Sequence, residues 1–224
     1  KKIVQDYKID TIISDSRFGL RHKKTRNFIL SHQLRILYPP KLQFLGMLLN
    51  RMNRYLLNRF DVCLIPDDEN HTFSGILSQN ARIRNQHFIG PMSRFYNIEK
   101  PSTTSSEELV FVFSGPEPQR TILEHLVVDQ LKNTSLSALL ISGQPEKSYA
   151  QQLTPNIRKV SHLTGPEFAA ALKKAKIVFS RSGYSSLMDY AALNLNQIVL
   201  IPTPGQTEQE YLAKKFSLTK KCFS

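Results

Sequence analysis

The sequence alternates between short apolar runs and longer segments in which apolar residues recur every three or four positions. The runs predict buried strands, and the longer spacing predicts amphipathic helices. In the first hundred residues we expect strands at 11–14, 27–30, 61–66 and 87–89, and a helix over 42–59. Gly90-Pro91 ends the last of these strands, and residues 100–106 are polar without a period. We therefore predict a domain over 1–100, a linker near 90–106 and a second domain over 107–224.

The second half shows the same alternation more regularly. Strands are expected at 109–113, 137–142, 157–161, 177–179 and 198–201, and helices at 119–131, 167–174 and 184–193. We interpret the order as β-α-β-α-β-α-β-α-β, which is typical of a parallel sheet with helices on both faces. The expected fold class is α/β, with two Rossmann-like parallel-sheet domains.

Residues 177–210 carry the strongest signal for chemistry. A strand ends in Ser180-Arg181-Ser182-Gly183 and a helix follows, while the next strand ends in Pro202-Thr203-Pro204-Gly205 before a polar cluster. Backbone N–H groups at a helix N-terminus can hold a phosphate, and α/β sheets bind ligands at the carboxyl ends of their strands. Asp189 lies six residues after Gly183. It is therefore close enough to reach a ribose attached to such a phosphate.

This segment resembles the C-terminal domain of the GT-B glycosyltransferases, in the family of the enzyme that adds N-acetylglucosamine to lipid-linked peptidoglycan precursors (glycosyltransferase family 28). The resemblance implies that the turn receives the donor pyrophosphate, that Asp189 pairs with the ribose hydroxyls and that a glutamine-rich loop holds the donor sugar. The family has Glu at the ribose position and often two adjacent glutamines in the loop, where this chain has Asp189 and Gln209-Glu210. Ser114-Gly115 and Ser142-Gly143 end two further strands at the same edge and could line the cleft. The candidate donor-binding residues are Ser114, Gly115, Leu163, Arg181, Ser182, Gly183, Asp189, Gln206, Gln209 and Glu210.

Each of these features also has an ordinary structural interpretation. Gly183 with its serines could be a common helix-start turn, and Asp189 could be an exposed or capping residue. The Arg181 side chain could point away from the pyrophosphate. Glu210 could complete a capping box in which Thr207 is the N-cap. Only the combination of turn, carboxylate and polar loop favours a donor site.

The resemblance also implies the two-domain GT-B layout over most of the chain. The family's first strand carries a Gly-rich loop with a His near the acceptor, and nothing similar precedes Thr11. Helices that cross back to the first domain are likewise not seen before Ser224. We therefore expect an incomplete N-terminal domain and only part of an acceptor site.

Charge adds a second signal. The chain has 30 basic and 18 acidic residues, a net +12, and residues 1–100 hold 17 and 8 of these, a net +9. Such a surface attracts nucleic acid, anionic lipid or a pyrophosphate-bearing substrate, or it is simply a solvated basic face. The arginine-rich helix over 42–59 could lie on an anionic membrane or pack in the core with a solvated basic side.

Few other residues suggest chemistry. His32 ends the second strand and is a candidate general base, although a structural histidine is the stronger interpretation. Cys63 and Cys222 are interpreted as reduced packing residues, and no cysteine–histidine spacing typical of a metal site is present. We expect no metal cofactor, no apolar stretch that spans a bilayer, and a cytoplasmic protein with peripheral contact at the inner face of the membrane.

The sequence thus predicts a hexosyltransferase that moves N-acetylglucosamine or a related hexose from a UDP donor to an acceptor, for which a lipid-linked molecule is one candidate. A sugar-nucleotide epimerase has the same layout and is one alternative. The other is a protein that binds nucleotide sugars or nucleic acid without catalysis, although the aromatic and basic pattern of RNA-binding modules is absent.

Overall fold

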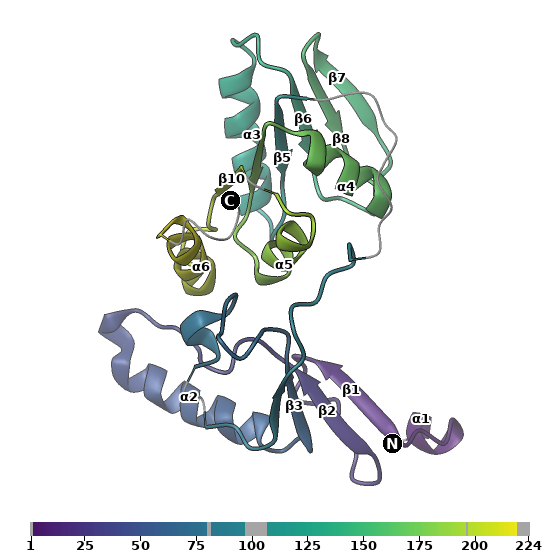
Figure 1. Cartoon of the computed structure of the whole chain (residues 1–224), viewed down its shortest axis with the longest axis vertical. Helices are drawn as coiled ribbons and strands as arrows, with labels where there is room; N and C mark the ends of the chain where they lie inside the picture. Colours follow the sequence, from purple (N-terminus) through teal and green to yellow (C-terminus); the bar gives the residue numbers. More distant parts are fainter. Residues whose placement is uncertain (1, 80–81, 97–106, 196, 219–224) are drawn as a thin grey trace. The chain divides into compact units, whose positions relative to one another are not determined.

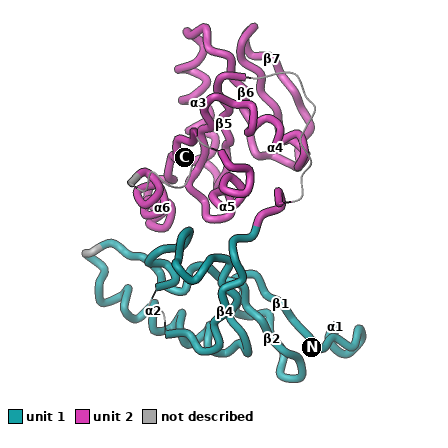
Figure 2. Tube along the Cα trace, viewed as in Figure 1, with its two compact units in different colours: residues 1–92 teal, residues 93–224 magenta. Residues whose placement is uncertain are grey.

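The computed structural model describes residues 2–79, 82–96, 107–195 and 197–218. The chain forms two compact units, Lys1–Met92 and Ser93–Ser224 (Figure 2). This boundary lies inside the segment predicted as a linker, of which residues 97–106 lie outside the described residues. Each unit has its own sheet and its own core (Figure 1).

Unit 1 contains a parallel sheet in the order β1-β2-β3-β4. Its strands are β1 (Thr11–Asp15), β2 (Arg26–Leu30), β3 (Val62–Ile65) and β4 (Gln86–Phe88). The helix α2 (Gln43–Leu57) connects β2 to β3, and the shorter elements are α1 (Lys2–Asp6), η1 (Pro40–Leu42) and η2 (Gly75–Leu77). The described strands succeed one another in a single direction across this sheet.

The core of unit 1 lies between this sheet and α2. It contains Ile29, Leu57, Cys63 and Ile65, all at most 1% exposed. Cys63 is a free thiol, and burial raises its pKa to about 12, which agrees with its interpretation as a reduced packing residue. Cys222 lies outside the described part of the chain.

Unit 2 contains a six-stranded sheet in the order β10-β9-β5-β6-β8-β7. Its strands are β5 (Leu109–Val112), β6 (Ala138–Ile141), β7 (Ala150–Thr154), β8 (Ile157–Val160), β9 (Ile177–Ser180) and β10 (Ile198–Leu200). Its helices are α3 (Gln119–Leu131), α4 (Gly165–Lys174), α5 (Tyr184–Ala192) and α6 (Thr207–Leu218).

Helices cover both faces of this second sheet, because successive apolar residues along its strands point to opposite faces. Val110, Leu139 and Val178 pack with residues of α4 and α5. The neighbouring residues Phe111 and Leu140 face the other way and pack with residues of α3. The predicted helices at 119–131, 167–174 and 184–193 thus match α3, α4 and α5 closely.

One element differs from the predicted alternation. Between β6 and β8 the chain forms the strand β7, antiparallel to β8, rather than a helix. The sequence of β7 is AQQLT, and its first four residues are exposed. An edge strand with such a polar surface lacks the apolar run by which buried strands are recognised.

The strand order creates a switch point in unit 2. The chain passes from β5 to β6 and then to β8, and after α4 it returns to the other side of β5 as β9. Crossover connections therefore leave β5 and β9 in opposite directions, and the carboxyl ends of these two strands flank a crevice. Open α/β sheets bind their ligands at such a point.

Candidate functional site

The turn between β9 and α5 stands at this switch point. Gly183 is the N-cap of α5 and makes no side-chain capping bond, so the positive end of the helix faces the turn without a side-chain oxygen to neutralise it. A hydrogen bond joins the residues on the two sides of the turn, since the Ser180 Oγ and the Tyr190 hydroxyl lie 2.5 Å apart. Burial raises the pKa of Tyr190 to about 12. This hydroxyl pair joins the end of β9 to α5, the two elements that flank the turn.

A cavity of about 260 Å³ lies at the carboxyl ends of β5, β6 and β8. Three of the predicted donor residues line it, namely Ser114, Leu163 and Asp189. Phe113, Gly143, His162, Phe168 and Ser186 belong to the same wall. Polar groups on apolar walls at this edge are the usual composition of a small-ligand site.

Asp189 is bound by two residues that the sequence analysis did not identify. The Ser93 Oγ donates to Asp189 Oδ1 over 2.7 Å, and Arg94 Nε lies 3.3 Å from Oδ2. The Asp189 side chain is 15% exposed and that of Arg94 is 63% exposed. Asp189 therefore still lines the cavity, and Arg94 balances the charge of its carboxylate.

Arg94 is also held by aromatic rings on the rim of the cavity. Its guanidinium carbon lies 4.7 Å from the ring centre of Phe95 and 5.3 Å from that of Phe168. Both distances fall within the range of a cation–π interaction. Ser93 and Asp189 are 96 positions apart, so no local sequence pattern could have linked them.

Arg181 points away from the turn. Its guanidinium is 3% exposed and donates to the carbonyl oxygens of Pro202 at 3.0 Å and Gln119 at 2.9 Å. Burial lowers the pKa of this guanidinium. Of the two interpretations of Arg181, the contacts support a positioning role, in which the side chain ties the loop after β10 and the start of α3 to the turn.

The polar cluster 206–210, most of which forms the first turn of α6, is largely occupied by hydrogen bonds within itself and to residues 203–205. Gln209 Oε1 accepts from the N–H of Thr203 at 2.9 Å, and Gln209 Nε2 donates to Gln206 Oε1 at 2.6 Å. Glu210 Oε1 accepts from the N–H of Gly205 at 2.9 Å. The alternative interpretation made Thr207 the N-cap of a capping box, but α6 begins at Thr207, so this residue is its first helical residue, and Glu210 Oε1 reaches back to Gly205.

The loop is nevertheless attached to the turn. The Ser182 Oγ donates to the carbonyl oxygen of Gln209 over 2.7 Å. Gly115 lies near the same loop, because a Cβ placed on it would be 3.8 Å from Thr203 Oγ1. Gly115, Arg181, Ser182, Gly183, Gln206, Gln209 and Glu210 thus surround the switch point without lining the cavity itself.

Three buried polar atoms mark this edge of the sheet. Within the described residues, the Ser142 Oγ, Arg181 Nε and Thr203 Oγ1 are the buried side-chain atoms without a hydrogen-bond partner. They follow β6, β9 and β10, each at its carboxyl end. Buried polar groups normally have partners, so a ligand or ordered water in this crevice would satisfy them. Neither Thr203 nor Ser142 is one of the predicted donor residues.

Larger hollows exist elsewhere. One of about 430 Å³ in unit 2 is lined by residues from the end of α4 and from the start of β9, including Lys173 and Lys176. It opens at the amino ends of the strands. Parallel sheets bind ligands at the opposite edge, so we give the smaller cavity near Asp189 priority as the donor site.

Unit 1 places His32 just after β2, at the carboxyl edge of its sheet, where the side chain is half-buried. A second polar group at this edge was missed. Asp67 follows β3, is fully buried, and accepts from the N–H groups of Phe73 at 3.1 Å and Ser74 at 2.7 Å. From Ser74 a chain of hydroxyls leads through Ser78 to His71 Nδ1.

Two further findings concern metals and membranes. Among the residues that the structure describes, no group of three or more His, Cys, Asp or Glu side chains is arranged to hold a metal ion. In the same part of the chain, no helix combines the length and the apolar character needed to cross a bilayer.

The glycosyltransferase family 28 C-terminal domain matches residues 109–223, which is 115 of the 224 residues. The fold is similar to that of the glycosyltransferase SnogD from Streptomyces nogalater, at 13% identity and a TM-score of 0.50 over 95% of this chain and 60% of that one. MurG from Acinetobacter baumannii is similar at 13% identity and a TM-score of 0.52, over 96% of this chain and 59% of that one.

A Listeria monocytogenes protein assigned as a UDP-N-acetylglucosamine 2-epimerase shares 11% identity and a TM-score of 0.55, over 96% of this chain and 66% of that one. At such identities the likeness concerns the fold, and the expected pair of Rossmann-like parallel-sheet domains of GT-B glycosyltransferases is confirmed. The chain spans about three fifths of the length of SnogD and of MurG. No curated protein sequence matches it.

Proposed function

The chain belongs to the family defined by the glycosyltransferase family 28 C-terminal domain, and on that premise we propose that it transfers a hexose, N-acetylglucosamine or a relative, from a UDP donor. The observation that carries this proposal is the meeting of Ser114, Leu163 and Asp189 in one cavity beside the N-terminus of α5. The Listeria protein of the same fold, whose name specifies a UDP-linked N-acetylglucosamine, supports a uridine donor.

The donor binds along the carboxyl edge of unit 2. The ribose hydroxyls donate to Asp189, and the base lies against Leu163, where backbone groups of the strand end can read its edge. The pyrophosphate rests on the N–H groups at the start of α5, after Ser182-Gly183. The sugar lies toward Gln206, Gln209 and Glu210, and the amides of the two glutamines can bind hydroxyls without requiring charge.

The departing diphosphate is stabilised by the positive end of α5. Charge develops on the leaving phosphate in the transition state, and fixed N–H groups at a helix N-terminus favour it without reorganisation. This stabilisation comes from the protein backbone, so we propose that the reaction needs no metal cofactor. Transfer in the presence of excess chelator tests this point.

The acceptor is proposed to bind unit 1 and to be lipid-linked. His32, at the carboxyl end of β2, is the proposed general base that takes the proton of the acceptor hydroxyl. The helix α2 exposes large apolar side chains, among them Phe44 at 81% and Tyr55 at 64%. With the basic excess of the first hundred residues, this surface supports peripheral contact with an anionic membrane at its cytoplasmic face.

Calorimetric titration tests the donor site directly. UDP, UDP-N-acetylglucosamine, GDP and dTDP are titrated into the full chain and into Asp189→Ala. We expect uridine nucleotides to bind at least tenfold more tightly than GDP, and Asp189→Ala to lose about tenfold of that affinity, because charge-assisted hydrogen bonds to the ribose are lost. Asp129→Ala is the matched control, since Asp129 is an exposed carboxylate paired with Lys132. Equal binding of all four nucleotides would contradict the proposal.

An epimerase is the second candidate, because the Listeria protein shares the fold. The two activities differ in their product. An epimerase converts UDP-N-acetylglucosamine to its isomer without any acceptor, whereas a transferase releases UDP and modifies an acceptor. Proton NMR of UDP-N-acetylglucosamine incubated with the chain alone distinguishes them, and we expect no epimer.

A further inference from the structure

A hollow of about 480 Å³ in unit 1 is lined by four arginines. They are Arg35, Arg51, Arg54 and Arg82. In the described part of the chain, none of their guanidinium groups takes part in a salt bridge. Four uncompensated cations around one concavity raise the local positive potential, and they favour an anionic occupant.

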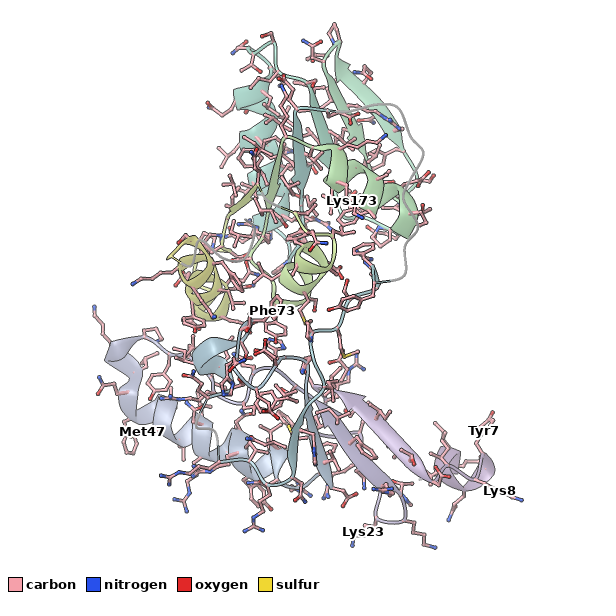
Figure 3. All side chains as sticks on the ribbon, in the orientation of Figure 1. Tyr7, Lys8, Lys23, Met47, Phe73 and Lys173 are labelled. Atoms are coloured by element: carbon pink, nitrogen blue, oxygen red, sulfur yellow. The ribbon has the colours of Figure 1, made fainter. Side chains whose placement is uncertain are left out.

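The helix α2 supplies one side of this hollow. Met47, Asn50, Arg51 and Arg54 line it, at positions i, i+3, i+4 and i+7 of the helix. These positions share one face. Met47 is labelled on α2 in Figure 3.

The segment 34–38 forms the opposite side and is fixed on α2 by specific contacts. Asn50 Oδ1 accepts from the N–H of Ile36 at 2.8 Å, and Asn50 Nδ2 donates to the Ile36 carbonyl at 3.0 Å. Asn53 Nδ2 donates to the carbonyl of Leu34 at 3.0 Å. The ring of Tyr38 lies directly on Gly46, where an added Cβ would be 2.2 Å from it.

The backbone of Arg35 is anchored as well. Its N–H donates to the carbonyl oxygen of Leu77 over 2.8 Å. Arg35, Arg51 and Arg54 therefore project from a framework that is held together without a ligand. A preformed arrangement loses less entropy when it binds, and planar guanidinium groups match phosphate oxygens in pairs.

We propose that this hollow binds the phosphate or diphosphate group of an anionic lipid. The lipid is favoured over a soluble phosphate because a second stripe of α2 exposes large apolar side chains next to the arginines. Phe44, Leu48 and Met52 on this stripe are 81%, 56% and 51% exposed. A helix with adjacent basic and apolar faces is suited to the interface of a bilayer, where the headgroup and the acyl chains meet.

This inference refines the membrane contact of the proposed function and depends on unit 1 alone. It requires neither nucleotide binding nor sugar transfer. Its failure is therefore distinguishable from failure of the donor site, which is read by UDP titration.

Vesicle co-sedimentation of the full chain provides the test. The vesicles contain phosphatidylcholine with either phosphatidic acid, which has an exposed phosphate monoester, or phosphatidylserine at matched surface charge. We expect at least fivefold tighter binding to phosphatidic acid, and a loss of tenfold or more in Arg51→Gln/Arg54→Gln. Contacts between a basic residue and an anionic surface contribute roughly fivefold per charge.

The matched control is Lys23→Gln/Lys24→Gln, which removes the same charge from an exposed loop of unit 1. It is expected to bind phosphatidic acid within about twofold of the unmodified chain. At 0.15 M salt the long-range attraction between these two exposed charges and the vesicle is largely screened. Equal binding of the two anionic lipids, or equal losses in the two double variants, would overturn the proposal.

Two further measurements separate the possible sources of the anion. Phe44→Ser/Leu48→Ser should weaken vesicle binding while leaving any affinity for inorganic pyrophosphate unchanged. If pyrophosphate binds the unmodified chain as tightly as the vesicles do, and Arg51→Gln/Arg54→Gln abolishes that binding, a soluble phosphate is the ligand of the hollow and the lipid assignment is wrong. If a 20-nucleotide oligonucleotide displaces the vesicles and binds more tightly at 0.15 M salt, the hollow belongs to a nucleic-acid surface instead.

Unchanged melting temperature and UDP affinity of each variant show that it is folded.

Discussion

Arg181 belongs to the proposed phosphate turn, yet its guanidinium contacts backbone carbonyls. Removing it would leave the oxygens of Pro202 and Gln119 buried without their donor. We expect Arg181→Met to lower the free energy of unfolding by about 2–4 kcal/mol, measured by urea denaturation. Apparent UDP affinity should fall only in proportion to the fraction of the protein that is no longer folded.

Arg181→Lys is the companion variant, because it keeps the charge and loses the planar fork. If Arg181 bound pyrophosphate instead, Arg181→Met would lose UDP affinity with almost no change in stability. Retained stability together with a tenfold loss of affinity would therefore contradict the positioning role.

Asp189 and its partners show which single residues can be predicted from a sequence and which cannot. Asp189 was identified because it lies a fixed distance after a recognisable turn. Its partners Ser93 and Arg94 were not, because contacts across 96 positions depend on the tertiary fold. Asp67 was missed for a related reason: its donors Phe73 and Ser74 form a loop with no distinctive spacing.

The helix α2 depends on a glycine that would ordinarily weaken it. Replacing an interior helical Gly by Ala usually stabilises by about 1 kcal/mol. At Gly46, however, the new Cβ would lie 2.2–2.3 Å from three ring atoms of Tyr38. We expect Gly46→Ala to lower the melting temperature and to weaken phosphatidic acid binding, because Tyr38 and the 34–38 segment must move.

Gly165 is the matched control for this change. It lies in the first turn of α4, and an added Cβ there meets nothing within 4 Å. Gly165→Ala should therefore be neutral or slightly stabilising by differential scanning fluorimetry. A melting temperature for Gly46→Ala at or above that of the unmodified chain would show that Tyr38 is not needed on the helix.

The α5 helix is fastened to β9 by the hydroxyl pair of Tyr190 and Ser180. Burial raises the pKa of Tyr190 to about 12, while an unfolded tyrosine titrates near 10. Between these values the unfolded state loses its proton first, so stability falls as pH rises. By pH 11 the loss attributable to this group is about 1.4 kcal/mol.

Tyr190→Phe isolates this effect, since it removes the titrating group and retains the ring. Its free energy of unfolding is expected to be lower than that of the unmodified chain at pH 8, because the hydrogen bond is gone. The difference should shrink by about 1 kcal/mol between pH 9 and 11, measured by urea unfolding. A difference independent of pH would show that Tyr190 titrates normally.

Among the elements, those with an apolar period were predicted well and those without it were not. The strands β5, β6 and β9 are continuous apolar runs because both faces of the sheet are covered. The strand β7 lies at an edge and is exposed, so its sequence contains no such run. The four-arginine hollow could not be predicted from the sequence either, because Arg35 and Arg82 lie outside α2 and meet its arginines only in the folded chain.

The division into two units determines how the chain should unfold and how ligands should act on it. Each unit has a separate sheet and a separate buried core. A ligand stabilises the part that binds it by RT ln(1 + [L]/Kd), about 2.7 kcal/mol at a concentration of 100 Kd. The proposed donor residues that line the cavity, Ser114, Leu163 and Asp189, all lie in unit 2.

We therefore expect scanning calorimetry to show two transitions, of which saturating UDP raises only one. Asp189→Ala should abolish that shift, whereas Arg51→Gln/Arg54→Gln should leave it intact, because these arginines lie in unit 1. Truncation is unnecessary for assigning the transitions, since Gly46→Ala lowers one of them selectively if the units unfold separately. A single transition that moves as a whole with UDP would show that the two units unfold together, and the nucleotide would then stabilise the acceptor side as well as its own site.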